Sequence, residues 1–276
     1  MIVDSHTHLF SENIDSYPRR SEPAGVQDVV ASAEQLKAEM DTAGVDRAVT
    51  ISPWIYLWDN GYVMDCLADF SEWLATVVLV DPKAPDGPEK LRRLVSRGAS
   101  GLRIHGRPFN HIACDDPVST PLWRAAAELD LAVDLCLTQD QYAEVESRLK
   151  EFSSLRVILD HCGYLSPELR PEVSTIEPAI ALAKYPNVYA KVTFLDVAAA
   201  GGWPYSNHHW MVRQVIEEFG PERCIWGSNF PTWIYSPGGT YTQNIEVFRN
   251  RIGLSESERS WVLGQTAATL WRWGDS

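Results

Sequence analysis

Residues 2–8 read IVDSHTH, a short apolar run that ends in two histidines. Runs of this kind, rich in β-branched residues, recur along the chain, and segments with helical periodicity lie between them. Alternating strands and helices are typical of a parallel sheet, and eight such units close into a barrel. The sequence therefore predicts an α/β fold, a single (β/α)8 barrel of the TIM type over residues 1–276. The predicted strands are 2–6, 47–52, 74–80, 100–105, 131–137, 155–161, 187–193 and 223–228.

The composition indicates a folded protein with an acidic surface. Of the 276 residues, 45% are hydrophobic and 11 are Trp, which is enough for a packed interior and excludes intrinsic disorder. Acidic side chains number 37 and basic ones 24, and the net charge of −13 repels phosphate backbones and anionic lipid. We therefore expect no nucleic-acid partner and no membrane partner. Nothing in the sequence indicates an oligomeric state.

The five cysteines favour a reducing compartment. Their number is odd and none are spaced as CxxC, which argues against a disulfide framework and against a cysteine-only zinc site. The first residues lack the basic region and long apolar stretch of a signal peptide. The longest strongly apolar run, LATVVLV at 74–80, is too short to cross a bilayer. These observations predict a soluble cytoplasmic protein.

The histidines of the first run have the spacing of a chelating pair. Side chains alternate along a strand, so Asp4, His6 and His8 are predicted to share the face that points into the barrel. Two imidazoles at this spacing can converge on one cation at ~2.1 Å each. Asp4 is then expected one layer below His6, as a residue that supports the ligands or as part of a salt bridge within the barrel.

The same alternation predicts which side chains of the later runs share a face. It pairs Arg103 with His105, and it places Asp160 on the face opposite to His161. Each predicted set ends at the carboxyl end of its strand, where barrel enzymes have their active sites. The remaining sets are Val157 with Leu159 and His161, Tyr189 with Lys191 and Thr193, and Gly227 with Asn229.

Five motifs in chain order resemble the amidohydrolase superfamily, in particular the branch with lactonases and zinc-dependent aromatic acid decarboxylases. The resemblance implies a distorted barrel of the metal-dependent hydrolase type with its site at the C-terminal mouth. It also implies that His6 and His8 are metal ligands or electrostatic residues, that His161 is a further ligand, and that the tip of the eighth strand is catalytic. The motifs are DSHTH (4–8), GLRIHG (101–106), LDHCG (159–163), NVYAK (187–191) and WGSNFP (226–231).

One position departs from the family pattern. Asn229 stands where the pattern has an Asp, and an amide is neither a general base nor a strong ligand for a divalent cation. A Zn²⁺ held by three neutral imidazoles could still ionise its water near pH ~7. Alternatively the metal is lost and the histidines carry protons themselves, or Asn229 is an inactivating substitution. Because the fourth run has no lysine to bridge two metals, we expect one divalent metal at most, Zn²⁺ in the favoured version.

Positive charge is predicted at the mouth of this acidic protein. Arg103 and Lys191, together with Arg107, would attract a carboxylate-bearing small-molecule substrate, which Arg103 could bind in a bidentate manner. The alternative is that Arg103 and Lys191 neutralise buried acids such as Asp4 or Asp134. His105 is expected above Arg103 at the rim, as a substrate contact or an acid-base residue.

Aromatic residues and two further histidines occupy the loops that follow predicted strands. Trp54 and Trp58 lie after the second strand, where they would line the substrate site or pack on each other. His208 and His209 follow the seventh strand, and adjacent side chains of an extended segment point apart, so at most one of them reaches the site. Cys162 is expected to pack rather than to react.

Together these observations predict a metal-assisted hydrolase, a lactonase that opens a cyclic ester bearing a carboxylate. His105 would protonate the leaving oxygen, and Asn229 would hydrogen-bond water or substrate. One alternative is a zinc-dependent decarboxylase of an aromatic or conjugated acid. Another, favoured only by Asn229, is a barrel that has lost catalysis and binds a ligand.

Overall fold

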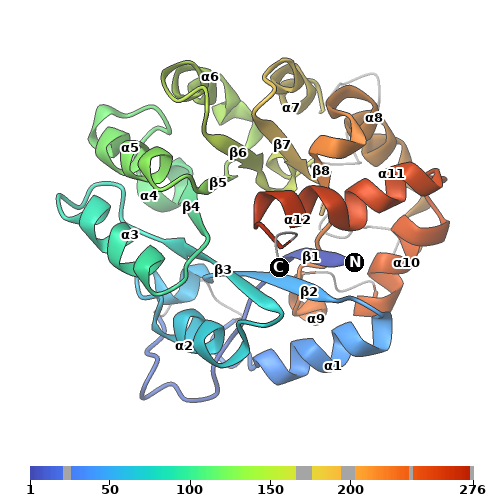
Figure 1. The fold of residues 1–276 in the computed structure, drawn as a ribbon, viewed down its shortest axis with the longest axis horizontal. Coiled ribbons are helices and arrows are strands. Elements are labelled where there is room, and N and C mark those ends of the chain that lie inside the picture. The colour runs from blue at the N-terminus through green and yellow to red at the C-terminus, as the bar shows by residue number, and fades with distance from the viewer. Residues whose placement is uncertain (21–25, 166–175, 194–202, 236–238, 274–276) are drawn as a thin grey trace.

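The computed structural model describes residues 1–20, 26–165, 176–193, 203–235 and 239–273. Its strands form one parallel eight-stranded sheet in chain order, which confirms the predicted barrel, and each predicted run overlaps one strand (Figure 1). The strands are β1 (Val3–Thr7), β2 (Arg47–Ile51), β3 (Leu74–Leu79), β4 (Gly101–His105), β5 (Ala132–Cys136), β6 (Arg156–Leu159), β7 (Val188–Lys191) and β8 (Cys224–Ile225).

The barrel closes where the chain beyond β8 returns to β1. Thr7 bridges in parallel to Phe230, the backbone N–H of Ser5 donates to the carbonyl of Trp226 over 3.0 Å, and that of Asn229 donates to the carbonyl of His6 over 3.0 Å. Closure leaves β1 and β8 without a free sheet edge at this seam. It also places the tip of β8 directly beside the histidines of β1.

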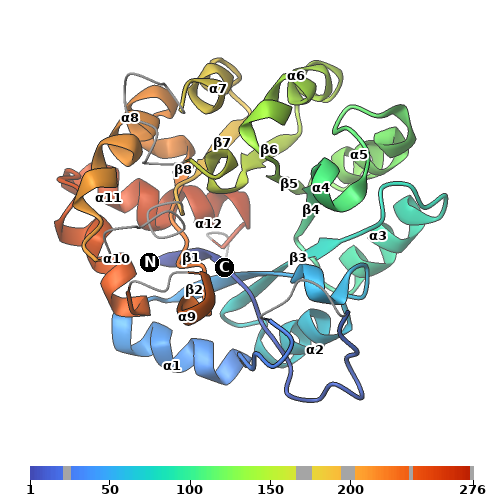
Figure 2. The same cartoon turned by 180° about the vertical axis from the view of Figure 1, so that it is seen from behind.

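Helices surround the strands on the outside of the ring (Figures 1 and 2). Ser32 and Ser255 each form a capping box with the first turn of the helix that follows, and this explains where the helices Ala33–Ala43 and Glu256–Ser260 begin. No helix of the described residues is long and apolar enough to cross a membrane. The helices are α1 (Ala33–Ala43), α2 (Gly61–Phe70), α3 (Gly87–Ser96), α4 (Arg107–Asn110), α5 (Thr120–Glu128), α6 (Tyr142–Glu151), α7 (Glu177–Ile180), α8 (His209–Phe219), α9 (Thr232–Tyr235), α10 (Tyr241–Asn250), α11 (Glu256–Ser260) and α12 (Thr266–Leu270).

The barrel interior changes character along its axis. Near the amino ends of the strands it is filled by a small apolar cluster that includes side chains of α12, which crosses this end of the barrel in Figure 1. Two residues further along β5 and β7 the side chains are charged, at Asp134 and Lys191. The functional groups therefore collect at the carboxyl ends of the strands. The apolar cluster comprises Val3, Val49, Ile51, Ala75, Val77, Ala132, Ile158, Ile225, Ala267, Leu270 and Trp271.

Candidate active site

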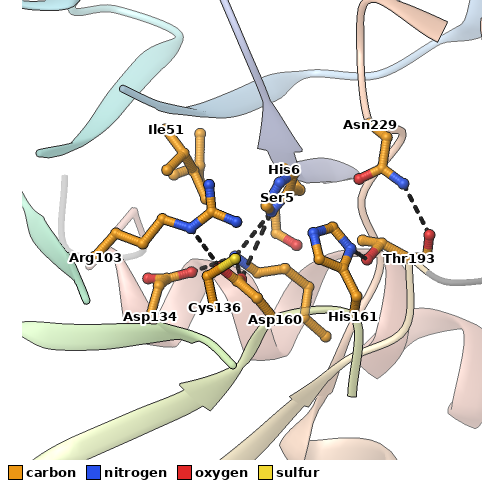
Figure 3. Close-up of polar contacts among 12 residues, drawn as sticks. Ser5, His6, Ile51, Arg103, Asp134, Cys136, Asp160, His161, Thr193 and Asn229 are labelled. Carbon is orange, nitrogen blue, oxygen red and sulfur yellow. Dashed lines mark hydrogen bonds and ion pairs between the residues drawn. The ribbon is translucent and has the colours of Figure 1, made fainter. Parts of the chain in front are cut away.

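Two carboxyl groups and two cations form the floor of the site. Lys191, fully buried, donates a short hydrogen bond to Asp134, and its Nζ lies 2.7 Å from Oδ1 of Asp160. Arg103 places Nε 2.8 Å from the other carboxylate oxygen of Asp160 (Figure 3). Burial alone would raise the pKa of Asp160, but Lys191 and Arg103 hold it well below its usual range. For Lys191 the structure therefore supports the alternative that it neutralises buried acids, instead of orienting a substrate.

Asp160 is the functional residue that sequence reasoning missed. Ile158 belongs to the apolar cluster inside the barrel, whereas Val157 and Leu159 pack in the larger cluster against the helices. Continued alternation points Asp160 inward, which is opposite to the predicted assignment. The signal was available, because two cations that point into one barrel, Arg103 on β4 and Lys191 on β7, require acidic partners in the same interior.

His161 reaches the site by a different route from the predicted one. Strand alternation would turn it toward the helices together with Leu159, but its backbone is left-handed, with φ 54° and ψ 18°. The turn brings its ring within 4.6 Å of the His6 ring, centroid to centroid, and its Nδ1 forms a short hydrogen bond with Thr193 Oγ1. The residue is in the site, while the reason given for its position was wrong.

Asp4 does not share a face with the two histidines, contrary to prediction. The pairing of β1 with β2 shifts by one residue between Asp4 and Thr7, as in a β-bulge, so the side-chain alternation is reset before His6. Asp4 instead accepts hydrogen bonds from Tyr241 Oη at 2.9 Å and from the backbone N–H of Ser228 at 2.8 Å. Burial raises its pKa to about 6. Asp4 therefore ties β1 to α10 and to the tip of β8.

His6 and His8 present their Nε2 atoms to each other at 3.2 Å. His8 Nδ1 lies 2.8 Å from the carbonyl oxygen of Ile51, which fixes its ring. Burial, together with the charge of Arg103, lowers the pKa of His8 to about 3. Burial, together with the charge of Lys191, lowers the pKa of His6 well below its usual range. Both rings are therefore neutral at physiological pH, which is the form that binds metals.

The histidine pair fits a divalent cation as two of its ligands. Two donors ~2.1 Å from one tetrahedral ion are about 3.4 Å apart, close to the 3.2 Å between the two Nε2 atoms. The predicted three-histidine site is not assembled, however. Within the described ranges no group of three or more His, Cys, Asp or Glu side chains is arranged to hold a metal ion. His161, the predicted third ligand, directs Nδ1 to Thr193.

Asn229 closes the site from the tip of β8. Its φ of 57° is left-handed, a conformation that Asn tolerates well. Its Nδ2 donates to the backbone carbonyl of Thr193 over 2.8 Å, and Figure 3 shows its Oδ1 turned to the side on which His6 lies. Gly227 allows this approach, because a Cβ there would lie 2.5 Å from the Cβ of His6. A carboxylate could not make the bond to Thr193.

His105 lies under aromatic side chains at the rim. It is 4% exposed, and its ring centroid is 4.9 Å from that of Trp54 and 4.7 Å from that of Phe109. Burial, followed by the charge of Arg103, lowers the pKa of His105 well below its usual range. Neither of its ring nitrogens has a hydrogen-bond partner among the described residues. Trp58 packs edge-on against Trp54, so the aromatic residues both contact each other and cover His105.

The other predicted residues lie around the site or outside the described part. The side chain of Arg107 is among those not described. His209 hydrogen-bonds to the carbonyl of Pro204 at 2.8 Å, while His208 is buried at the start of α8. Cys162 is fully buried with its Sγ 3.7 Å from the carbonyl of Lys191, in agreement with a packing role.

The barrel and its strand-tip site define the class of protein. The model of the amidohydrolase family matches residues 3–273, so the chain belongs to this family and is a hydrolase of it, as the sequence predicts.

Three similar proteins illustrate the range of the family. The chain is 28% identical over 240 residues to L-fucono-1,5-lactonase of Burkholderia ambifaria, covering 83% of this chain and 80% of that protein. A probable 2-pyrone-4,6-dicarboxylic acid hydrolase from Acinetobacter baumannii, solved with citric acid bound, has a TM-score of 0.84 at 20% identity and covers 98% of this chain and 99% of its own. An amidohydrolase from Burkholderia multivorans, solved with zinc bound, has a TM-score of 0.77 at 19% identity over 99% of both chains.

Proposed function

We propose that the protein hydrolyses the ester bond of a lactone that carries a carboxylate. The observation that carries this proposal is the unpartnered imidazole of His105 at the end of β4. Both of its ring nitrogens lack partners within the described part of the chain, and Arg103, two residues earlier on the same strand, is held by its ion pair with Asp160. Buried polar groups without partners cost about 1–3 kcal/mol each, and a bound substrate would remove that cost. The lactonase among the similar proteins supports a lactone as the substrate.

The substrate would be oriented by charge and by shape. The two terminal nitrogens of Arg103 suit a carboxylate in a bidentate pair. Trp54, with Trp58 packed against it, provides an apolar wall for the lactone ring beside His105. Asp160 and Lys191 keep the Arg103 side chain in place without competing for the substrate, because both are committed to the buried ion-pair cluster.

His6 and His8 would hold one divalent cation, which when bound polarises a carbonyl group and lowers the pKa of water. The carbonyl of Ile51 orients His8 for this task. Asn229, whose amide is fixed by Thr193, would accept a hydrogen bond from the attacking water. His105, neutral and with a free ring nitrogen, would take the proton of that water. It would then pass the proton to the ring oxygen as the carbon–oxygen bond breaks, so that a hydroxy acid is formed.

The test is hydrolysis of matched lactones with and without a carboxylate, by zinc-loaded protein, followed as acid release. Arg103→Lys keeps a cation for Asp160 but loses the bidentate fork. We expect kcat/KM to fall about 30- to 100-fold for the carboxylated lactone and little for the neutral one. Failure to hydrolyse any lactone overturns the proposal, and release of CO2 from an aromatic acid would favour the decarboxylase alternative.

A further inference from the structure

Lys191 contacts the histidine pair as well as the acids. Its Nζ lies 3.3 Å from Nδ1 of His6, in addition to its bonds to Asp134 and Asp160. An ammonium group has three hydrogens and no lone pair, so it is the donor in every contact that it makes. His6 Nδ1 is therefore the acceptor, and the single proton of this neutral ring is on Nε2.

The neighbouring contacts agree with this assignment. The carbonyl of Ile51 can only accept, so His8 carries its proton on Nδ1 and has a lone pair on Nε2. The N–H at His6 Nε2 can then donate to His8 Nε2 across the 3.2 Å that separates them. Every donor in the series from Lys191 through His6 and His8 to Ile51 faces an acceptor.

A metal would require a different proton arrangement at His6. Both Nε2 atoms must offer lone pairs to bind one cation. As long as Lys191 donates to Nδ1 of His6, however, the proton of His6 is on Nε2 and no lone pair is available there. The alternative acceptor for a proton on Nδ1 is Oδ1 of Asp160, which lies 3.6 Å away. A carboxylate behind a histidine is the usual support for a metal-binding imidazole. Lys191 and Asp160 therefore compete for the same ring nitrogen.

We propose that Lys191 is a positioning residue that sets the tautomer of His6 and thereby lowers the affinity of the histidine pair for a divalent cation. The inference rests on the proposed use of His6 and His8 as metal ligands, and it assumes nothing about the substrate. Lys191 is thus more than a counter-ion for buried acids. It determines whether the two imidazoles bond to each other or are free to bind a cation.

The first test uses the unaltered, metal-free protein. ¹⁵N NMR of histidine-labelled protein reports which ring nitrogen is protonated, and the His6 signals are assigned as those that vanish in His6→Asn. We expect the proton of His6 on Nε2. A proton on Nδ1 overturns the proposal, and since no variant of Lys191 is involved, this result is independent of how such a variant folds.

The second test measures zinc affinity by competition with a chromophoric chelator. Lys191→Met combined with Asp134→Asn removes one cation and one acid, so the buried cluster keeps its charge balance. We expect about tenfold tighter zinc binding and transfer of the His6 proton to Nδ1. Asp134→Asn alone is the matched control and should bind zinc as the parent does. Equal or weaker binding in the double variant overturns the proposal, and both measurements are made without substrate, so inactivity toward lactones would not affect them.

Discussion

The two halves of the barrel interior are built on the same strands and are equally buried, but one is apolar and the other is charged. In β5 the inward side chain changes from Ala132 to Asp134, and along β6 and its continuation it changes from Ile158 to Asp160. One step of about 6.6 Å along a strand therefore separates an apolar cluster from a network of buried charges. The apolar half is closed by α12, while the charged half opens toward the loops that carry Trp54.

The difference teaches which half stabilises the fold. Burying one large apolar side chain in the apolar half contributes about 1.5–3 kcal/mol to the stability of the fold. Buried ion pairs such as Lys191 with Asp160 recover little more than their desolvation penalty, although breaking one of them costs about 3–5 kcal/mol. We therefore expect the charged half to serve the proposed chemistry more than stability, and substitutions in the two halves should separate loss of activity from loss of stability.

The largest effect is expected in the charged half, for His8→Asn. The variant removes the Nε2 lone pair that faces His6, so kcat/KM for lactone hydrolysis should fall about a thousandfold, or about 4 kcal/mol in activation free energy. The free energy of unfolding, measured with urea, should change little. His209→Asn is the control, because the ring of His209 hydrogen-bonds to the backbone carbonyl of Pro204, outside the site. Activity near that of the parent would remove the histidine pair from the mechanism.

The next effect is expected in the apolar half, for Ile158→Ala. Ile158 is fully buried, and truncation leaves a cavity that should cost about 2–4 kcal/mol of unfolding free energy. The activity of the folded fraction should stay near that of the parent. Ile14→Ala, at a position 59% exposed, is the control and should change stability little. A loss of activity at full stability would show that the two halves are not separable in this way.

The sequence predicted the barrel and most of the inward faces because both depend on local alternation. Arg103 and His105 on β4, and Lys191 with Thr193 at the end of β7, are regular positions, and their side chains lie in the site as predicted. The count of strands followed from apolar runs that a parallel sheet buries on both faces, and eight such strands close into a barrel.

The errors occurred where the backbone departs from a regular strand. The register shift at Asp4 lies where β1 pairs with β2 on one side and with the chain after β8 on the other, and both partners are distant in the sequence. The left-handed turn at His161 likewise depends on partners, here Thr193, that are distant in the sequence. Neither departure leaves a signal in its own short stretch, so Asp160 was placed outside the site and Asp4 inside it.

A smaller effect is expected at the rim of the charged half, for Asn229→Asp. In the parent, the amide of Asn229 donates to the carbonyl of Thr193 at 2.8 Å. A carboxylate in its place would put two acceptors face to face, so the free energy of unfolding should fall by about 1–3 kcal/mol and activity should also fall. Thermal unfolding and kcat/KM are measured together. Asn13→Asp is the control, because its side-chain oxygen accepts from Ser16 N, which a carboxylate does equally well. A large gain in rate would instead identify Asn229 as an inactivating residue.

The smallest effect is expected outside the barrel, at Glu258, in the helix that leads to α12. Glu258 accepts a hydrogen bond from the backbone N–H of Ser255 at 2.7 Å and lies 3.2 Å from Arg213, and both contacts lower its pKa in the folded state. A lowered folded pKa stabilises the protein above the unfolded value of about 4.3, and the contribution is lost as pH falls through the folded pKa. Glu258→Gln should therefore cost about 0.5–1 kcal/mol near neutral pH, a modest amount because the site is partly solvated.

Urea unfolding of the parent and of Glu258→Gln at neutral and at acidic pH measures this difference. We expect the gap between the two proteins to narrow as the parent's carboxylate becomes protonated, since the amide of the variant does not titrate. Glu256→Gln, in the same first turn but without the bond to Ser255, should show a smaller gap. If the difference in unfolding free energy between the two proteins stays constant with pH, the charge of Glu258 does not stabilise the folded protein.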